Sequence, residues 1–168
     1  TALQQGGYVI SWESLEQDGD GYGVYAQLFD ANDQPQGGEI KVNHFSAYSQ
    51  KNPAITALHQ GGFVVTWSGQ GESDNQGIWA QRFDAEGNAL GTELKVNTFS
   101  ANSQSRPAVN PLSDGGFVIS WESEQQDKGD LAGQTGVYSQ IFDAQGRAMV
   151  SDFTVNSTVA GTQSEPSV

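Results

Sequence analysis

The chain contains three copies of one sequence pattern, and this internal repeat constrains its fold more than any other feature. The segments TALQQGGYVISW, TALHQGGFVVTW and NPLSDGGFVISW align with one another, and the register persists through GVYAQLFDA, GIWAQRFDA and GVYSQIFDA to EIKVN, ELKVN and DFTVN. Self-similarity of this kind is typical of architectures in which each repeat is one supersecondary unit that stacks on its neighbours. We therefore treat residues 1–168 as a single repeat domain, with repeats 1–55, 56–109 and 110–168.

The spacing of the shared motifs separates a rigid framework from one variable loop. The Phe of the FDA motif precedes the Asn of the VN motif by 14 residues in every copy, and a Pro follows that Asn after 10 residues. By contrast, the strand Trp precedes the next shared aromatic residue by 13, 12 and 17 residues. Surface loops tolerate such changes of length, so we expect one exposed, acidic loop in each repeat.

Each repeat has the pattern of four short β-strands. The segments PAITAL (53–58), GGFVVTW (61–67), GVYAQLF (23–29) and EIKVN (39–43) are rich in β-branched and aromatic residues and are bounded by Gly, Asn, Asp and Ser. The stretches that begin at Asp30, Asp84 and Asp143 predict hairpin connections, because Asp bonds its own backbone and Gly adopts positive φ. No helical period is present, so the predicted fold class is all-β.

Four-stranded repeats of 54 to 59 residues match the blades of a β-propeller, including those of the kelch type. Propellers usually contain about four to eight blades, and this chain supplies three. The strand at 53–58 is continuous at the repeat junction, whereas its counterpart is divided between the chain ends, TAL and PSV. We therefore expect either a window from a longer array or copies that complete one another, two of them forming a six-bladed ring. The alternatives are a pseudo-threefold β-trefoil or β-prism that closes alone, and an extended solenoid or sandwich array.

Charge and composition exclude several classes of protein. The chain has 7 Lys and Arg against 20 Asp and Glu, a formal net charge of −13, which disfavours binding to nucleic acids and to anionic membrane surfaces. Divalent cations are more natural ionic partners. The sequence predicts no membrane span and no signal peptide. The absence of cysteine excludes disulfides, thiolate metal sites and cysteine nucleophiles, and an acidic, glycine-rich chain without cysteine favours secretion.

The acidic loops are the strongest candidates for metal binding. In EQDGDGYG, Asp18 and Asp20 alternate with Gly, an arrangement that lets hard oxygen ligands converge on Ca²⁺ in a tight turn. The first loop lacks the further ligand and the distal Glu of an EF-hand. The corresponding loops supply Asp74, Asp127 and Asp130, but by sequence the three loops share no ligand position. Two interpretations stay open: sites with Ca²⁺ as cofactor, and solvated turns shaped by Asp and Gly, which the sequence favours.

Aromatic residues recur in the centres of the predicted strands, where large rings fill the space between packed sheets. We expect these residues to form the core rather than sugar-stacking platforms: Trp12, Trp67, Trp121, Tyr25, Trp79 and Tyr138. The less regular Tyr22 and Tyr48 lie in or near loops and are better candidates for ligand contact. They would serve in a multivalent carbohydrate-binding lectin, which gains avidity from corresponding sites on successive repeats.

Two further polar positions recur in all three repeats. The amides of Gln27, Gln81 and Gln140 share a strand face with aromatic residues, so they need hydrogen-bond partners. We expect them to bond neighbouring backbone and fix strand register; lining of a central channel is the alternative. Asparagine also ends the last strand of each repeat, which predicts side-chain-to-backbone bonding in the following turn. These residues are Asn43, Asn97 and Asn156.

Catalysis has little support in the sequence. There is no cysteine, and His44 and His59 occur at single, non-equivalent repeat positions, so no pair of nucleophile and base is indicated. The glycine-rich stretches are not followed by helices and therefore do not predict a phosphate site. A glycan-cleaving propeller enzyme is the least favoured alternative.

The motifs GGFVVTW, GVYAQ-x-FDA, E-x-x-VN and SQ-x-x-PAV resemble tandem repeats of very large bacterial surface and secreted proteins, including adhesins of the RTX type. The resemblance spans essentially the whole chain and implies an extracellular, calcium-rich setting with a role in adhesion or surface display. The nonapeptides of the RTX calcium roll are absent, so no calcium ligand carries over. We therefore expect a non-enzymatic extracellular module for adhesion or self-assembly, whose partner is another copy of itself or a glycan.

Overall fold

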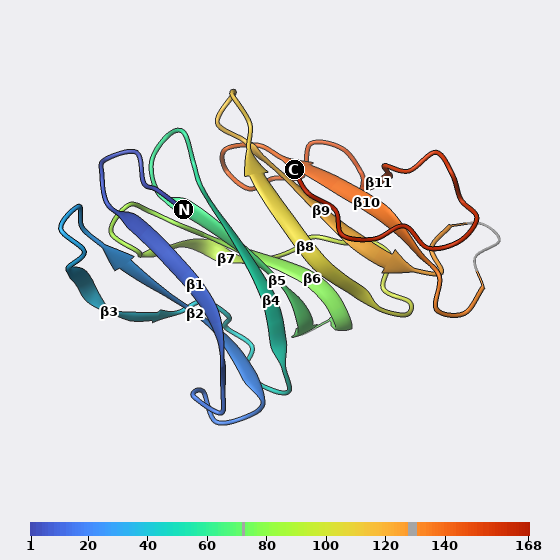
Figure 1. The fold of residues 1–168 in the computed structure, drawn as a ribbon, viewed down its shortest axis with the longest axis horizontal. Coiled ribbons are helices and arrows are strands. Elements are labelled where there is room, and N and C mark those ends of the chain that lie inside the picture. Colours follow the sequence, from blue (N-terminus) through green and yellow to red (C-terminus); the bar gives the residue numbers. More distant parts are fainter. Residues whose placement is uncertain (72, 128–130) are drawn as a thin grey trace.

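The computed structural model describes residues 1–71, 73–127 and 131–168, and these fold into three antiparallel sheets (Figure 1). The first sheet contains β1 (Tyr8–Leu15), β2 (Tyr22–Phe29) and β3 (Pro35–Lys41). The second contains β4 (Gln50–Ala57), β5 (Phe63–Gly71), β6 (Asp74–Phe83) and β7 (Ala89–Lys95). The third contains β8 (Gln104–Pro111), β9 (Phe117–Glu124), β10 (Thr135–Phe142) and β11 (Phe153–Thr154). Each strand pairs with the next along the chain within its sheet, and the all-β expectation is confirmed.

The strands differ from the expected pattern in three places. The first sheet has three strands rather than four, because Ala2 forms only an isolated bridge with Tyr8. Strands β3 and β7 begin within the stretches predicted as hairpin connections, at Pro35 and Ala89. Pro35 is tolerated there because β3 is an edge strand. Strand β4 also crosses the boundary between residues 55 and 56, so each sheet is offset from the repeat that the sequence defines.

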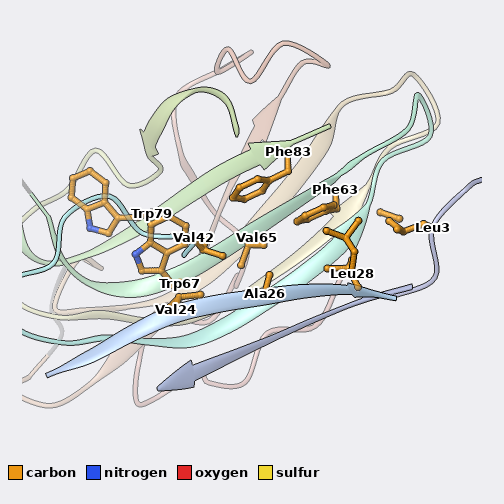
Figure 2. Packing of buried hydrophobic residues seen from close by; sticks show 12 residues of the cluster. Leu3, Val24, Ala26, Leu28, Val42, Phe63, Val65, Trp67, Trp79 and Phe83 are labelled. Atoms are coloured by element: carbon orange, nitrogen blue, oxygen red, sulfur yellow. The ribbon is translucent and has the colours of Figure 1, made fainter. Parts of the chain in front are cut away.

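The three sheets stack in chain order. Strand β4 packs against β1 and β2, while β8 packs against β4, β5 and β6. Side chains alternate between the two faces of a strand, so the middle sheet contributes one face to each interface. Between the first and second sheets, the core includes Val24, Ala26, Leu28 and Val42 on one side and Phe63, Val65 and Trp67 on the other (Figure 2). Between the second and third sheets, it includes Ile78, Ala80 and Val96 against Phe117, Ile119 and Trp121.

The prediction that the recurring aromatic residues form the core is confirmed for five of the six positions. Trp67 and Trp121 are fully buried, and Tyr25, Trp79 and Tyr138 are nearly so. Trp12 is only half-buried, because in the described structure no sheet precedes the first one. The repeat therefore places Trp12 at a core position that has no covering layer.

The recurring glutamines fix strand register, as expected. Strand β2 has a bulge opposite β3 between Ala26 and Leu28, and β6 has the corresponding bulge opposite β7. Gln27 sits at the first bulge, where its amide donates to the carbonyls of Leu28 at 2.9 Å and Gln36 at 3.1 Å. Gln81 repeats both contacts, with the carbonyls of Arg82 at 2.9 Å and Leu90 at 3.4 Å, and Gln140 donates to the carbonyl of Val150. The buried amide thus bonds a carbonyl of the neighbouring segment where the ladder is interrupted.

The hairpin aspartates also act as expected. Oδ1 of Asp84 accepts the N–H groups of Glu86 at 3.0 Å and Asn88 at 2.8 Å. Asp30 and Asp143 make the same contacts in their hairpins. The hydrogen bond from the Asn88 side chain, together with the backbone donors, holds the pKa of Asp84 below its usual value.

The described stack does not close on itself. The outer faces of the first and third sheets carry solvent-exposed apolar side chains, which a self-closing threefold fold would bury against one another. Among the described residues, no helix has the length and apolar character needed to cross a membrane.

Candidate functional site

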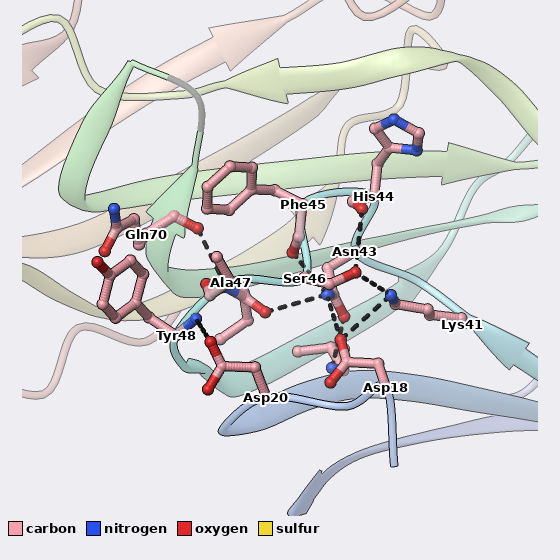
Figure 3. Close-up of polar contacts among 12 residues, drawn as sticks. Asp18, Asp20, Lys41, Asn43, His44, Phe45, Ser46, Ala47, Tyr48 and Gln70 are labelled. Atoms are coloured by element: carbon pink, nitrogen blue, oxygen red, sulfur yellow. Dashed lines mark hydrogen bonds and ion pairs between the residues drawn. The ribbon is translucent and has the colours of Figure 1, made fainter. Parts of the chain in front are cut away.

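A cluster of polar side chains, called the hub below, recurs at one end of each sheet. It is centred on the Asn that follows the last strand of the repeat. In the first hub, Asn43 Oδ1 accepts the N–H of Val24 at 2.7 Å and Nδ2 donates to Asp18 at 3.3 Å. Figure 3 shows Asn43 with Asp18 and Lys41 beside it. The other two hubs repeat this geometry: Asn97 bonds Ile78 at 2.7 Å and Asp74 at 2.9 Å, and Asn156 bonds Val137 at 2.7 Å and Asp127 at 3.0 Å.

A lysine neutralises the buried carboxylate in the first two hubs. Lys41 Nζ lies 3.2 Å from Asp18, and Lys95 Nζ lies 3.1 Å from Asp74. Burial acts to raise the pKa of Asp74, but the hydrogen bond from Asn97 and the other donors, with the charge of Lys95, hold it below its usual value. The third repeat has Thr154 at the lysine position, and there the hydroxyl of Tyr138 donates to the carboxylate. The hubs are thus alike in geometry but not in charge.

The first two hubs also join one sheet to the next. Asn43 Nδ2 donates to Gln50 Oε1 at 3.0 Å, and Gln50 begins β4 of the second sheet. Gln50 in turn donates to the carbonyls of Ala47 at 2.9 Å and Gln70 at 3.2 Å. Asn97 makes the equivalent contact with Gln104, at 3.2 Å. Each of these hubs therefore connects the end of one sheet to the first strand of its successor.

A glycine at the start of the second strand motif makes room for the hub carboxylate. A Cβ atom at Gly136 would lie 2.5 Å from Asp127 Oδ2, and one at Gly23 would lie 2.9 Å from Asp18 Oδ2. A Cβ at either position would force the hub carboxylate to move from its place, so the recurring Gly of the GVY and GIW motifs suits the position of the Asp.

The acidic loops share no aligned ligand position in the sequence, but the structure places one carboxylate of each loop at an equivalent point. Asp18, Asp74 and Asp127 occupy the same place in successive hubs. Sequence alignment does not show this, because these residues precede the recurring Gly by 5, 3 and 9 positions. The three carboxylates reach equivalent places because each accepts a hydrogen bond from the Asn that follows the last strand of its repeat.

The carboxylates proposed as calcium ligands make mainly structural contacts. Asp20 accepts the N–H of Tyr48 at 2.9 Å, and Asp18 Oδ1 is buried without a hydrogen-bond partner. Asp130 lies outside the described residues. Within residues 1–71, 73–127 and 131–168, no three His, Asp or Glu side chains gather closely enough to hold a metal ion. Calcium binding stays a prediction from the sequence.

The two tyrosines proposed for ligand contact lie near each other at one end of the first two sheets. Lys51 Nζ stands 4.0 Å from the centroid of the Tyr22 ring, and the N–H of Tyr22 donates to Ser49 Oγ at 3.3 Å. Tyr48, the residue before Ser49, has a side chain that is 62% exposed. Tyr48 and Lys51 line the same polar groove, of about 340 Å³.

Acidic side chains also clasp the backbone of the neighbouring sheet. The N–H of His44 donates to Glu93, and the N–H of Thr98 donates to Asp152 at 3.1 Å. His44 and Thr98 are equivalent, as are Glu93 and Asp152, so one contact recurs at both interfaces. The first of these contacts borders a larger groove, of about 690 Å³, between the first and second sheets. Sequence reasoning missed these acids, because they lie in a predicted strand rather than a loop.

The two ends of the stack expose positions that are buried inside it. Ile10 of the first sheet is 48% exposed, whereas the equivalent Val65 and Ile119 are fully buried. At the other end, Val155 is 54% exposed, whereas the equivalent Val96 is 3% exposed. We call the surface of Tyr8, Ile10 and Trp12 the head face, and that of Val137, Ile141 and Val155 the tail face.

Comparison with protein-family models and with curated protein sequences finds no match to the chain.

Proposed function

We propose that the chain is a non-enzymatic repeat module for self-assembly or adhesion outside the cell, in which copies stack head face to tail face. The observation that supports this is the pair of exposed end faces. Ile10 occupies the position at which Val65 and Ile119 enter the core, and Val155 occupies that of Val42 and Val96. If a second copy packs on the first as each sheet packs on its neighbour within the chain, the head face of one copy covers the tail face of the other. Both faces would then be buried against apolar side chains of the right size.

Polar groups at the ends also suit this arrangement. Glu39 is exposed and occupies the position of Glu93 and Asp152, the acids that clasp the neighbouring sheet. Ser157 is exposed and occupies the position of His44 and Thr98, the donors. In the stacked pair, the N–H of Ser157 in one copy would donate to Glu39 of the next. Within the single chain, Glu39 accepts the Gln17 amide at 2.6 Å, an exposed contact that water can replace.

The proposed contact joins two different surfaces and is therefore heterologous. Such contacts close into a ring if the rotation between copies allows it, and otherwise form open filaments. Each sheet is an antiparallel meander in chain order, as in a propeller blade. Two copies joined at both ends would form a closed ring of six sheets, and this ring is one of the assemblies that we propose. The extracellular setting rests on the resemblance to surface-protein repeats and on the acidic, cysteine-free composition.

Two variants, each blocking one face, test the proposal together. We expect Ile10→Lys and Val155→Lys each to stay monomeric alone, because every contact needs one head face and one tail face. An equimolar mixture should form a one-to-one dimer through the two intact faces. A lysine added to a chain of charge −13 reduces overall repulsion, so a loss of assembly would reflect the blocked face.

Leu15→Lys is the matched control. Leu15 belongs to the same strand as Ile10 and is 57% exposed, but the alternation of side chains places it on the opposite face. This variant should assemble like the unmodified chain. Assembly that survives both face substitutions, or a mixture that stays monomeric while the unmodified chain assembles, would contradict the proposal.

A further inference from the structure

Tyr48 occupies a backbone position that disfavours its side chain. Its φ is +63°, in the left-handed region, where bulky residues are uncommon. The equivalent residues of the other repeats are Asn102, with φ +58°, and Gly161, with φ +85°. Asn and Gly are the residues that tolerate this conformation best. The first repeat therefore places a large aromatic ring where its relatives within the same chain have a small, unstrained residue.

The surrounding structure holds this conformation firmly. Asp20 accepts the N–H of Tyr48 at 2.9 Å (Figure 3). A Cβ at Gly21 would collide with the carbonyl oxygen of Tyr48, so the close approach of the two segments requires glycine. The ring itself is 62% exposed and belongs to neither core cluster. Packing therefore does not account for the aromatic side chain, and strained residues of this kind cluster at functional sites.

The groove beside Tyr48 has the chemistry of a site for neutral hydroxylated ligands. Its volume is about 340 Å³, and amide and hydroxyl side chains dominate its lining, among them Asn52, Ser68, Gln70 and Gln76. Lys51 supplies the charged group in this lining, and its ammonium lies over the Tyr22 ring. Amides and hydroxyls both donate and accept hydrogen bonds, as the hydroxyl groups of a sugar require.

We propose that this groove binds a neutral glycan, with the face of one sugar ring on Tyr48 and its hydroxyl groups bonded to the side chains of Asn52, Gln70 and Gln76. The chain's charge of −13 favours neutral over acidic saccharides by repulsion. The site lies outside the head and tail faces, so it goes beyond the proposed self-assembly and does not depend on it.

The test is binding of the full chain to immobilised neutral polysaccharides, a glucan, a galactan, a mannan and chitin, with the acidic polysaccharide alginate as comparator. We compare the unmodified chain with Tyr48→Asn and Tyr48→Phe. Tyr48→Asn copies the residue of the second repeat, so it should fold and its melting temperature should not fall. Tyr48→Phe keeps the ring.

We expect the unmodified chain and Tyr48→Phe to bind at least one neutral polysaccharide, and Tyr48→Asn to bind it about tenfold more weakly or not at all. Loss of binding without loss of stability would distinguish a ligand contact from a structural role. The proposal is overturned if no neutral polysaccharide binds, if Tyr48→Asn binds as well as the unmodified chain, or if alginate binds more tightly than all four.

Discussion

The asparagine at the centre of each hub should contribute more to stability inside the stack than at its end. Asn97 is buried and makes four side-chain hydrogen bonds: it accepts from Ile78 at 2.7 Å and donates to Asp74 at 2.9 Å, to the Phe99 carbonyl at 2.7 Å and to Gln104 at 3.2 Å. Asn97→Ala removes all four. The N–H of Ile78 and the carbonyl of Phe99 lose these partners, while Lys95 still pairs with the carboxylate.

The magnitude follows from the groups left without partners. Each buried donor or acceptor without a partner costs about 1–3 kcal/mol, and two such groups remain, so Asn97→Ala should lower the free energy of unfolding by about 2–6 kcal/mol. Asn156→Ala is the matched control. Asn156 is only half-buried, and its environment at the tail face is open to water, so its replacement should cost about half as much or less.

Urea unfolding followed by tryptophan fluorescence measures both losses by linear extrapolation. The four tryptophans of the chain report on the sheets that contain them. If Asn97→Ala lowers the free energy of unfolding by less than about 1 kcal/mol, this reasoning is refuted, because the groups left without partners would then cost little. Equal losses in the two variants would also refute it, since burial would then not decide the cost.

Three further outcomes follow from the same contacts. Because the pKa of Asp84 is lowered in the folded chain, its stabilising effect is present above its unfolded pKa of about 4 and is lost as the pH falls through the folded value. Asp84→Asn should therefore flatten the acid side of the stability curve measured by urea unfolding between pH 2 and 7, and an unchanged curve would contradict this. Gly136→Ala should lower the melting temperature because its Cβ would lie 2.5 Å from Asp127 Oδ2, whereas Gly38→Ala meets no atom within 4 Å and should not; equal melting temperatures in calorimetry would refute the clash. Since Lys41 and Lys95 already neutralise two hub carboxylates, excess EDTA should leave the melting temperature unchanged. A melting temperature that rises with added Ca²⁺ would contradict this and would support the calcium sites predicted from the sequence.

Local patterns were sufficient to predict the strands, the core and the register contacts. Alternation of apolar residues placed Trp67 and Trp121 in the core, and the recurrence of Gln27 and its equivalents indicated an amide bonded to backbone. Strand limits were less accurate, because the pairing of Pro35 with Phe29 depends on the neighbouring strand rather than on local propensity.

The equivalence of the hub carboxylates could not be predicted from the sequence. Loop length varies between the strand Trp and the recurring Gly, so no alignment column contains Asp18, Asp74 and Asp127 together. Their common place depends on the Asn that each carboxylate meets in space. The acidic clasps formed by Glu93 and Asp152 were missed for a related reason, because a contact between sheets leaves no periodic signal within one strand.

Sedimentation velocity of the unmodified chain over a wide range of concentrations tests the central claim most directly. Head-to-tail stacking predicts species heavier than the 17.9 kDa monomer that increase with concentration and decrease in Ile10→Lys. A single 17.9 kDa species at every concentration would contradict the claim that the exposed end faces bind one another.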